Sequence, residues 1–435
     1  MYIIPGSSAH GAGNEERRTL RAVIRPSSQV SDVSCLRAAA VTDANGRSQT
    51  NLVVGYASGA VSVYSCSTYR ELWSARAHDV DASVIELHIV EEGDGHIMLT
   101  QSRTGEVVRW EIDWVGRRFV RTGRLDRADP TVNPELNPKG ENDIDIEETT
   151  YSFARMCCVP EHGVVAYPSK GNSVTVHRYE TSARVVLDTR TGGLVTALSG
   201  TMGVDGALLV CVGYESGLVE VYDVRMEDGG GDGDGDGETS PSGRVVYSVE
   251  APGTDPCVAL DCCLVRTSLG EVRIARGFAG DGTADVGGSE IGQLPSRNPP
   301  LVHLGALTAA SERVEDRESL DSNISYVYQH TASVMETPKG MMATLRGMDQ
   351  VIFRKDGKYV AVACWDGKVR IYRASTGKLV DVIVHHTQAS TSFAFVDTGR
   401  DGALLVVGSR DGTCSLFSLR SPVSIRGMNE HEITR

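Results

Sequence analysis

The stretch that decides the fold is Val360-Ala-Val-Ala-Cys-Trp-Asp-Gly-Lys-Val-Arg-Ile-Tyr372. It reads as an apolar strand, an Asp-Gly turn, and a second strand whose apolar and polar residues alternate up to an aromatic residue. An Asp-Gly pair between two such strands is a strong local signal for a β-hairpin. Two short hairpin strands cannot bury an inner face alone, so the unit needs flanking strands and neighbouring units.

The same pattern recurs along the chain. The turn glycines Gly59 and Gly105 lie 46 residues apart, and Gly367 and Gly412 lie 45 apart. This spacing is close to the ~40–45 residues of a WD40 blade. Further copies of the pattern are Leu52–Tyr64, Ile97–Trp110, Leu208–Asp223 and Leu405–Phe417, with weaker ones at Val164–Tyr179 and Cys257–Phe278.

The repeat predicts an all-β fold, a seven-bladed WD40 β-propeller with acidic and low-complexity loop insertions. The segment Leu20–Arg25 precedes the first repeat and is predicted to close the ring as a fourth strand of the last blade, which removes an exposed strand edge. We expect a tail at 1–19, the propeller at 20–419 and a second tail at 420–435. The expected blades are 31–76, 78–125, 151–189, 191–250, 256–307, 340–384 and 385–419, and the expected insertions are about 126–149, 226–243, 279–299 and 308–339, the last with a short helix at Ala309–Leu320.

The charge lies mostly in two loops. Glu141–Glu148 carries five acidic groups and Glu227–Glu238 carries six, and these account for most of the net charge of −14. No basic stripe is present that could neutralise phosphates, so direct nucleic-acid binding is not expected. The apolar runs are far shorter than a membrane span, and no signal peptide is evident, so we expect an intracellular protein without a membrane partner.

No cofactor or metal site is predicted. The ten cysteines include no CxxC pair, so we expect buried free thiols and neither a zinc site nor a disulfide framework. The tract Asp232–Gly237 matches the opening of a calcium loop, but position twelve would be Gly243 where such loops place a bidentate Glu. The Gly-rich tract is acidic, which disfavours phosphate binding.

The candidate site residues are assigned to a structural network that locks the blades. Asp366 and Asp411 stand in Asp-Gly turns, and in WD40 blades such an Asp bonds with a His and a Ser or Thr. Trp110 and Trp365 are expected in the core. An enzyme would need several acidic or His side chains converging on the ring axis, and the repeats show none, so no catalytic residue is assigned. The predicted network comprises His78, Ser102, Trp110, Trp365, Asp366, His385, His386, Ser409 and Asp411.

The C-terminal repeats also resemble a known family. The segment Gly347-Met-Asp-Gln-Val-Ile-Phe-Arg-Lys-Asp-Gly-Lys-Tyr-Val-Ala-Val-Ala-Cys-Trp-Asp-Gly-Lys-Val-Arg-Ile-Tyr372 is similar to the penultimate blade of the ASTRA-associated protein 1 family. Animal members of that family are called guanine nucleotide-binding protein subunit beta-like protein 1. Lys378–His386 and Gly408–Leu419 resemble the family's closing blade, and Leu208–Val224 resembles its Gly-Tyr-Glu-x-Gly blade, although Phe417 replaces the usual Trp.

The resemblance implies a nuclear scaffold subunit, with the cytoplasm as a second compartment. It implies association with the ASTRA assembly, which is linked to chromatin remodelling and includes co-chaperone subunits that mature phosphatidylinositol-3-kinase-related kinases. We expect a monomeric, non-catalytic propeller within a larger complex. The alternative is a generic WD40 adaptor, such as a signalling propeller or the substrate receptor of a ubiquitin ligase.

Overall fold

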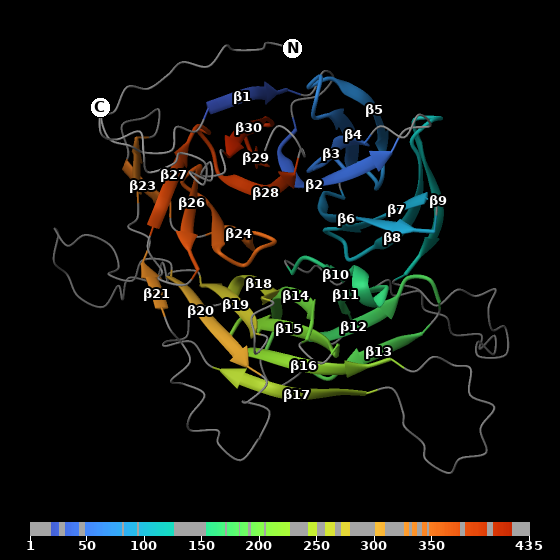
Figure 1. Cartoon of the computed structure of the whole chain (residues 1–435), viewed down its shortest axis with the longest axis vertical. Helices are drawn as coiled ribbons and strands as arrows, with labels where there is room; N and C mark the ends of the chain where they lie inside the picture. The colour runs from blue at the N-terminus through green and yellow to red at the C-terminus, as the bar shows by residue number, and fades with distance from the viewer. Residues whose placement is uncertain are drawn as a thin grey trace, which may run out of the picture.

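The strands of the computed structural model pair into sheets that stand in a ring around a common axis (Figure 1). The predicted all-β propeller is therefore confirmed. The described residues are 19–25, 31–42, 48–80, 82–93, 95–125, 154–169, 172–181, 183–189, 193–203, 206–226, 242–249, 257–265, 271–278, 301–308, 326–329, 333–336, 342–345, 348–374, 379–397 and 403–419.

Seven sheets contain four antiparallel strands each, and we number them in chain order. Sheets one to three are β2 (Val33–Thr42) to β5 (Glu71–Arg76), β6 (Val84–Glu92) to β9 (Arg118–Arg124), and β10 (Cys157–Val159) to β13 (Arg184–Leu187). Between their ends lie β3 (Ser48–Tyr56), β4 (Ala60–Ser65), β7 (Gly95–Ser102), β8 (Val107–Asp113), β11 (Val164–Ser169) and β12 (Ser173–Arg178). A 3-10 turn, η2 (Pro160–His162), connects β10 to β11.

The remaining sheets follow the same plan. Sheet four is β14 (Val195–Met202), β15 (Leu208–Tyr214), β16 (Val219–Arg225) and β17 (Ser242–Val249). Sheet five is β18 (Cys257–Val265), β19 (Glu271–Phe278), β20 (Leu301–Thr308) and β21 (Tyr326–Gln329). Sheet six is β24 (Met348–Phe353), β25 (Tyr359–Cys364), β26 (Lys368–Arg373) and β27 (Leu379–Val384). Sheet seven is β28 (Ser390–Asp397), β29 (Ala403–Ser409), β30 (Cys414–Leu419) and β1 (Thr19–Ile24), and β22 (Ser333–Glu336) pairs with β23 (Met342–Leu345).

The hairpin that suggested the fold shows why the sheets stack. Because successive side chains of a strand point to opposite faces, Val360 and Val362 of β25 pack toward sheet five. Ala361 and Ala363 of the same strand pack toward Phe393 and other residues of sheet seven. Each central strand therefore belongs to two cores, and neither face can be satisfied without a neighbouring sheet.

Gly367 is required in the turn of this hairpin for two reasons. Its φ of 76° lies in the left-handed region that favours glycine. A Cβ atom there would also lie 2.7 Å from the carbonyl oxygens of His386 and Gln388. The turn can thus pack directly on the segment that leads into sheet seven.

The strand β1 closes the ring as predicted. It pairs antiparallel with β30, with Leu20 opposite Phe417 and Ile24 opposite Cys414. Ala22 and Ile24 are buried in the core between sheets seven and one. N- and C-terminal strands therefore share one sheet, and β30 has no free edge.

The structure changes one sequence prediction next to sheet five, the insertion at 308–339. The fourth strand of this sheet, β21, and the strand β22 both lie within 308–339, which was expected to be an insertion outside the repeat. These strands are only four residues long, too short to show the alternation that marks the other repeats. The predicted helix at 309–320, most of the other predicted insertions and the tail 420–435 lie outside the described residues.

Candidate functional site

The inner strands of the sheets line a cavity of about 1030 Å³ along the ring axis. In six sheets the inner strand carries one extra residue near its start, where its register with the second strand shifts. Such bulges redirect side chains and occur often beside binding sites. All six extra residues line the cavity: Ser34, Ile85, Thr196, Val258, Asp349 and Thr391.

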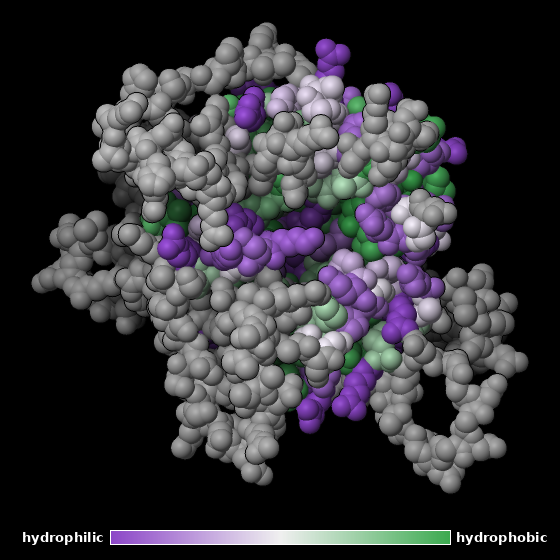
Figure 2. All heavy atoms as spheres, in the orientation of Figure 1, coloured by the Kyte–Doolittle hydropathy of each residue, from purple (hydrophilic) through white to green (hydrophobic). Residues whose placement is uncertain are grey.

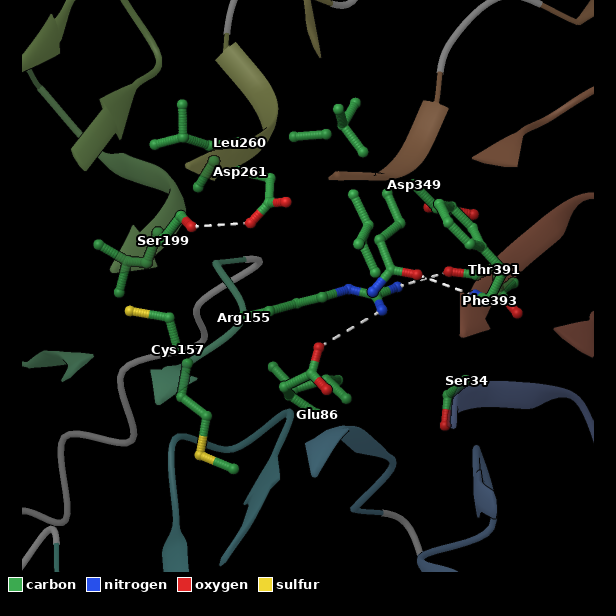
Figure 3. A pocket seen from close by; sticks show the side chains of 18 of the residues that line it. Ser34, Glu86, Arg155, Cys157, Ser199, Leu260, Asp261, Asp349, Thr391 and Phe393 are labelled. Atoms are coloured by element: carbon green, nitrogen blue, oxygen red, sulfur yellow. Dashed lines mark hydrogen bonds and ion pairs between the residues drawn. The ribbon is translucent and has the colours of Figure 1, made fainter. Parts of the chain in front are cut away.

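Arg155 extends through the middle of this cavity (Figure 3). It precedes β10 by two residues, and its Nη2 donates a hydrogen bond of 3.0 Å to the carbonyl oxygen of Thr391 in sheet seven. Gln101 fixes the backbone around it: its Nε2 donates to the carbonyl of Ala154 at 3.1 Å, and its Oε1 accepts from the amide of Met156 at 2.6 Å. The Arg155 side chain therefore connects sheet three with sheet seven across the cavity.

Glu86 is a buried carboxylate held between two arginines. Its Oε1 lies 2.8 Å from Nη2 of Arg37, and its Oε2 lies 3.7 Å from Nη1 of Arg155. The backbone amide of Leu87 donates to Oε1 at 3.0 Å. Because a buried charge is tolerated only when it is paired and hydrogen-bonded, these contacts compensate the burial of Glu86 and fix its side chain in place.

Asp261 joins three sheets on another side of the cavity. Its Oδ2 accepts from the amide of Phe353 in sheet six at 2.7 Å, and its Oδ1 accepts from the hydroxyl of Ser199 in sheet four at 3.1 Å. Burial raises the pKa of Asp261 to about 6, although these hydrogen bonds oppose the shift. Burial, with a contribution from Arg37, lowers the pKa of His88 to about 4, so this imidazole, which also lines the cavity, is neutral at pH 7.

One end of the cavity, which we call the mouth, is formed by turns between second and third strands. Ala57, Arg103, Trp365 and Arg410 all stand two residues before the turn glycine of their own sheet and line the cavity together with Asp32. Figure 2 shows hydrophilic side chains gathered around the centre of this view. Most of the side chains named for the mouth therefore occupy the same position of the repeat, and the residue type at that position differs from sheet to sheet.

Asp349 lies at the base of the mouth. Nη2 of Arg410 is 3.9 Å from its Oδ2. Burial raises the pKa of Asp349, while Arg155 and Arg410 act in the opposite direction. Arg155, Asp349 and Arg410 therefore form one electrostatically connected group that reaches from the cavity to its rim.

The predicted network is present in sheet seven, with one change of partner. Nδ1 of His386 lies 2.9 Å from Oδ2 of Asp411, and its Nε2 lies 2.7 Å from the hydroxyl of Ser415. Ser409 instead accepts a hydrogen bond from the backbone amide of Asp411 at 3.2 Å. Burial raises the pKa of Asp411, but hydrogen bonds from His386 and Thr413 outweigh it and leave the pKa well below its usual range.

Sheet two contains a related arrangement in which glutamate replaces aspartate. Nδ1 of His78 lies 2.9 Å from Oε2 of Glu106, and this hydrogen bond is the main reason that the pKa of Glu106 falls to about 2. The hydroxyl of Ser102 accepts from the amide of Glu106 at 3.1 Å. Trp110 is buried, as predicted, and its Nε1 donates to the hydroxyl of Thr100 at 2.9 Å.

Three predicted members of the network have other surroundings. Asp366 pairs with Arg370, whose Nη1 and Nη2 lie 3.1 and 2.7 Å from its two oxygens, and no histidine is among the partners described for it. Arg370 belongs to β26, the strand that follows this turn, and its guanidinium is the hydrogen-bond donor that holds Asp366 in place. His385 packs edge-to-face on His386 and Phe417 instead of binding an aspartate. Trp365 is half-buried and lines the mouth, so its assignment to the core was wrong.

The expectation that no acidic or His side chains converge on the axis was also wrong. Glu86, His88, Asp261 and Asp349 all line the cavity. Glu86 and His88 come from β6, Asp261 from β18 and Asp349 from β24, which are inner strands, whereas the repeat pattern covers the second and third strands. Each of these strands has a bulge near its start, which helps to decide which side chain faces the axis and which the repeat pattern does not reveal.

The described residues contain no candidate metal centre. Among them, no group of three or more His, Cys, Asp or Glu side chains is placed to hold a metal ion. Nine cysteines there are free thiols. None of the helical segments that the structure describes is long and apolar enough to cross a bilayer. The cavity with its mouth is therefore the candidate site.

Comparisons with known proteins agree on the fold. Residues 340–398 match the family model of the anaphase-promoting complex subunit 4 WD40 domain. ASTRA-associated protein 1 of Pyricularia oryzae is 24% identical over 406 residues, which cover 84% of this chain and 85% of that protein. A crystal structure of Chaetomium thermophilum Raptor matches with a TM-score of 0.56 and 12% identity over 92% of this chain, which spans 28% of the Raptor chain. The fold is a WD40 β-propeller, and the resemblance to ASTRA-associated protein 1 is confirmed.

Proposed function

We propose that this protein is a non-catalytic scaffold subunit that plays the part of ASTRA-associated protein 1 in an ASTRA-like assembly. The observation that carries the proposal is the similarity to that protein over 84% of this chain and 85% of the relative. The partners would then be protein subunits, among them the co-chaperones that mature phosphatidylinositol-3-kinase-related kinases. The nucleus is the compartment, with the cytoplasm second, and chromatin remodelling is the process served.

The mouth of the cavity is the surface that we assign to a partner. Its side chains come from one repeat position in different sheets, so the ring can present a mixed set of groups without altering the strands. Trp365 and Arg410, the residue types most enriched at the centre of protein interfaces, lie there together. A rigid ring with a variable rim is suited to binding a short segment of another protein.

The charged groups of the cavity support a scaffold better than an enzyme. Glu86 is held by arginines and a backbone amide, and Asp261 by an amide and a hydroxyl. A general base needs a free acceptor within reach of a substrate proton. Carboxylates whose oxygens are already bonded tie the sheets together and leave little capacity for proton transfer.

We also infer that sheet five is a complete blade, so that the ring has seven blades. Its backbone pairing runs from β18 through β21. Residues of β18 and β19 pack against sheet four and also against sheet six. A four-stranded sheet with neighbours on both faces meets the requirement that defines a blade.

An affinity purification with variants of the mouth tests the proposal. The tagged full-length chain is expected to recover co-chaperone subunits of the assembly. Trp365→Ala removes the aromatic side chain, and Ala57→Gln adds bulk without a charge and without removing a side-chain contact, so both should reduce that recovery. Arg118→Ala is the matched control, because Arg118 lies in β9, outside the cavity, with 70% of its side chain exposed.

Two results would contradict the proposal. Equal recovery with wild type and both mouth variants would show that the partner binds elsewhere on the propeller. Recovery of cullin components in place of co-chaperones would favour the alternative, a generic WD40 adaptor acting in a ubiquitin ligase. The match of residues 340–398 to the WD40 domain of an anaphase-promoting complex subunit supports testing that alternative, because that subunit is also part of a larger assembly.

A further inference from the structure

The charges that a partner can reach at the mouth are mainly positive. Arg410 is 51% exposed and Arg155 is 23% exposed. Asp349 is 18% exposed, and its Oδ2 atom is shielded from solvent. Glu86 is 2% exposed. Arg410 is therefore more exposed than Asp349 and Glu86, and Asp32 is an exposed acidic group at the rim.

The arginines at the base of the mouth outnumber the carboxylates by one. Glu86 and Arg37 form a close pair at 2.8 Å and cancel. Arg155 and Arg410 then share one carboxylate, that of Asp349, which approaches Arg410 only to 3.9 Å. His88 is neutral at pH 7 because burial lowers its pKa. The other charged groups that line the cavity balance in number: Arg103 and Lys355 are basic, and Asp32 and Asp261 are acidic.

We propose that the mouth receives one carboxylate side chain of the partner, an Asp or a Glu. The carboxylate is bound by the guanidinium of Arg410 at the rim, attracted by Arg155 beneath it, and flanked by the indole of Trp365. An arginine at a partly enclosed site is a strong carboxylate donor. This inference rests on the proposed docking at the mouth and specifies the chemistry that the docking reads.

A basic side chain fits the same place poorly. To reach Asp349 it would have to displace Arg410 and approach Arg155, and like charges at such distances repel. A phosphorylated residue carries about two negative charges at neutral pH. The single excess positive charge therefore matches a monoanion, and the carboxylate is the monoanion that unmodified protein segments supply.

The test is a fluorescence-anisotropy titration of the full-length chain with labelled hexaglutamate and labelled hexalysine at low ionic strength. Arg410→Gln should weaken hexaglutamate binding by about five- to tenfold, as expected for loss of one charge-assisted hydrogen bond. Hexalysine binding should be the same in the variant and the wild type. Arg118→Gln is the matched control, since it removes the same charge outside the cavity and should leave hexaglutamate binding unchanged.

The outcomes separate this inference from the proposed function. Equal hexaglutamate affinity in wild type and Arg410→Gln would overturn the carboxylate site, as would an equal loss in Arg118→Gln, which would indicate unspecific attraction. If Trp365→Ala and Ala57→Gln still reduce partner recovery in that case, docking at the mouth stands and only its chemistry is wrong. A phosphoserine hexapeptide that binds more tightly than hexaglutamate and depends on Arg410 would also overturn the choice of a monoanion.

Discussion

Single buried charges tie neighbouring sheets of this ring together. Glu86 accepts from Arg37 of sheet one and lies near Arg155 at the start of sheet three. Asp261 accepts from sheets four and six. Such pairs contribute little net stability, since desolvation offsets their attraction, but removal of one partner leaves an uncompensated charge and costs several kcal/mol, about 3–5. Their main effect is to fix the order and spacing of the sheets.

Asp411→Ala is expected to lower the free energy of unfolding by about 1–3 kcal/mol. Asp411 lies 2.9 Å from Nδ1 of His386 and 2.6 Å from the hydroxyl of Thr413, and both donors would lose their acceptor. Equilibrium denaturation at pH 7 measures the change. Glu161→Ala, at an exposed position of η2, is the control and should unfold like the wild type. An unchanged midpoint for Asp411→Ala would refute the role assigned to this network.

Asp261 gives stability a pH dependence opposite to that of most acids. Its folded pKa of about 6 exceeds the ordinary unfolded value of about 3.9. The native state therefore holds this proton more tightly, and the stabilisation is present below about pH 4 and lost as the pH rises through 6. Between pH 4 and pH 7 the wild type should lose about 1–3 kcal/mol relative to Asp261→Asn. Denaturation curves of both proteins at each pH measure the difference, and parallel behaviour would contradict the shift.

The elements that were predicted are those that repeat a local pattern. Leu208–Asp223 and Val360–Tyr372 became paired second and third strands, because both faces of these strands are buried and their turns contain glycine. The short outer strand β21 was not foreseen. The cavity residues could not be predicted from the repeat either, since bulges in six of the inner strands help to decide which side chain faces the axis.

Removal of residues 1–24 is expected to open the ring. The deletion takes away β1, exposes the edge of β30, and uncovers the core that Ala22 and Ile24 help to fill. We expect a loss of about 3–6 kcal/mol and concentration-dependent aggregation, because a free edge is a template for pairing. Thermal unfolding with light scattering measures both effects. A deletion of residues 1–17, which keeps β1, is the control, and identical behaviour of the two truncations would show that closure by β1 is dispensable.

At the scale of the whole molecule, closure and charge act together. Residues from the two ends of the chain share sheet seven, so the ring presents its mouth as one rigid surface. The net charge of −14 comes largely from Glu141–Glu148 and Glu227–Glu238, which lie outside the described residues. The mouth thus offers a local positive charge within an acidic molecule. The net negative charge can attract a partner with basic regions from a distance, whereas the mouth binds an acidic side chain at short range, so one partner can carry both features.

Deletion of residues 227–238 is expected to leave the fold intact. The strands on either side are paired up to Arg225 and Ser242, so the sheet is already closed at the base of this segment. The deletion removes six acidic groups, and six fewer negative charges should slow the arrival of a basic probe such as hexalysine. The effect should be clear at low salt and absent at about 0.5 M salt, where charges are screened within a few ångström.

Thermal unfolding and stopped-flow association, each with the wild type alongside, measure these two expectations. A tract of Gly and Asp has almost no apolar area with which to dock, so its effect on a partner should be confined to the association rate. Replacement of its six acidic residues by Asn and Gln keeps the length of the segment. It should slow association at low salt as much as the deletion does, because we attribute the effect to charge alone. The electrostatic role is refuted if the deletion unfolds the propeller, or if the deletion variant still binds the probe more weakly than the wild type at high salt. The tract would then be a structural or recognition element.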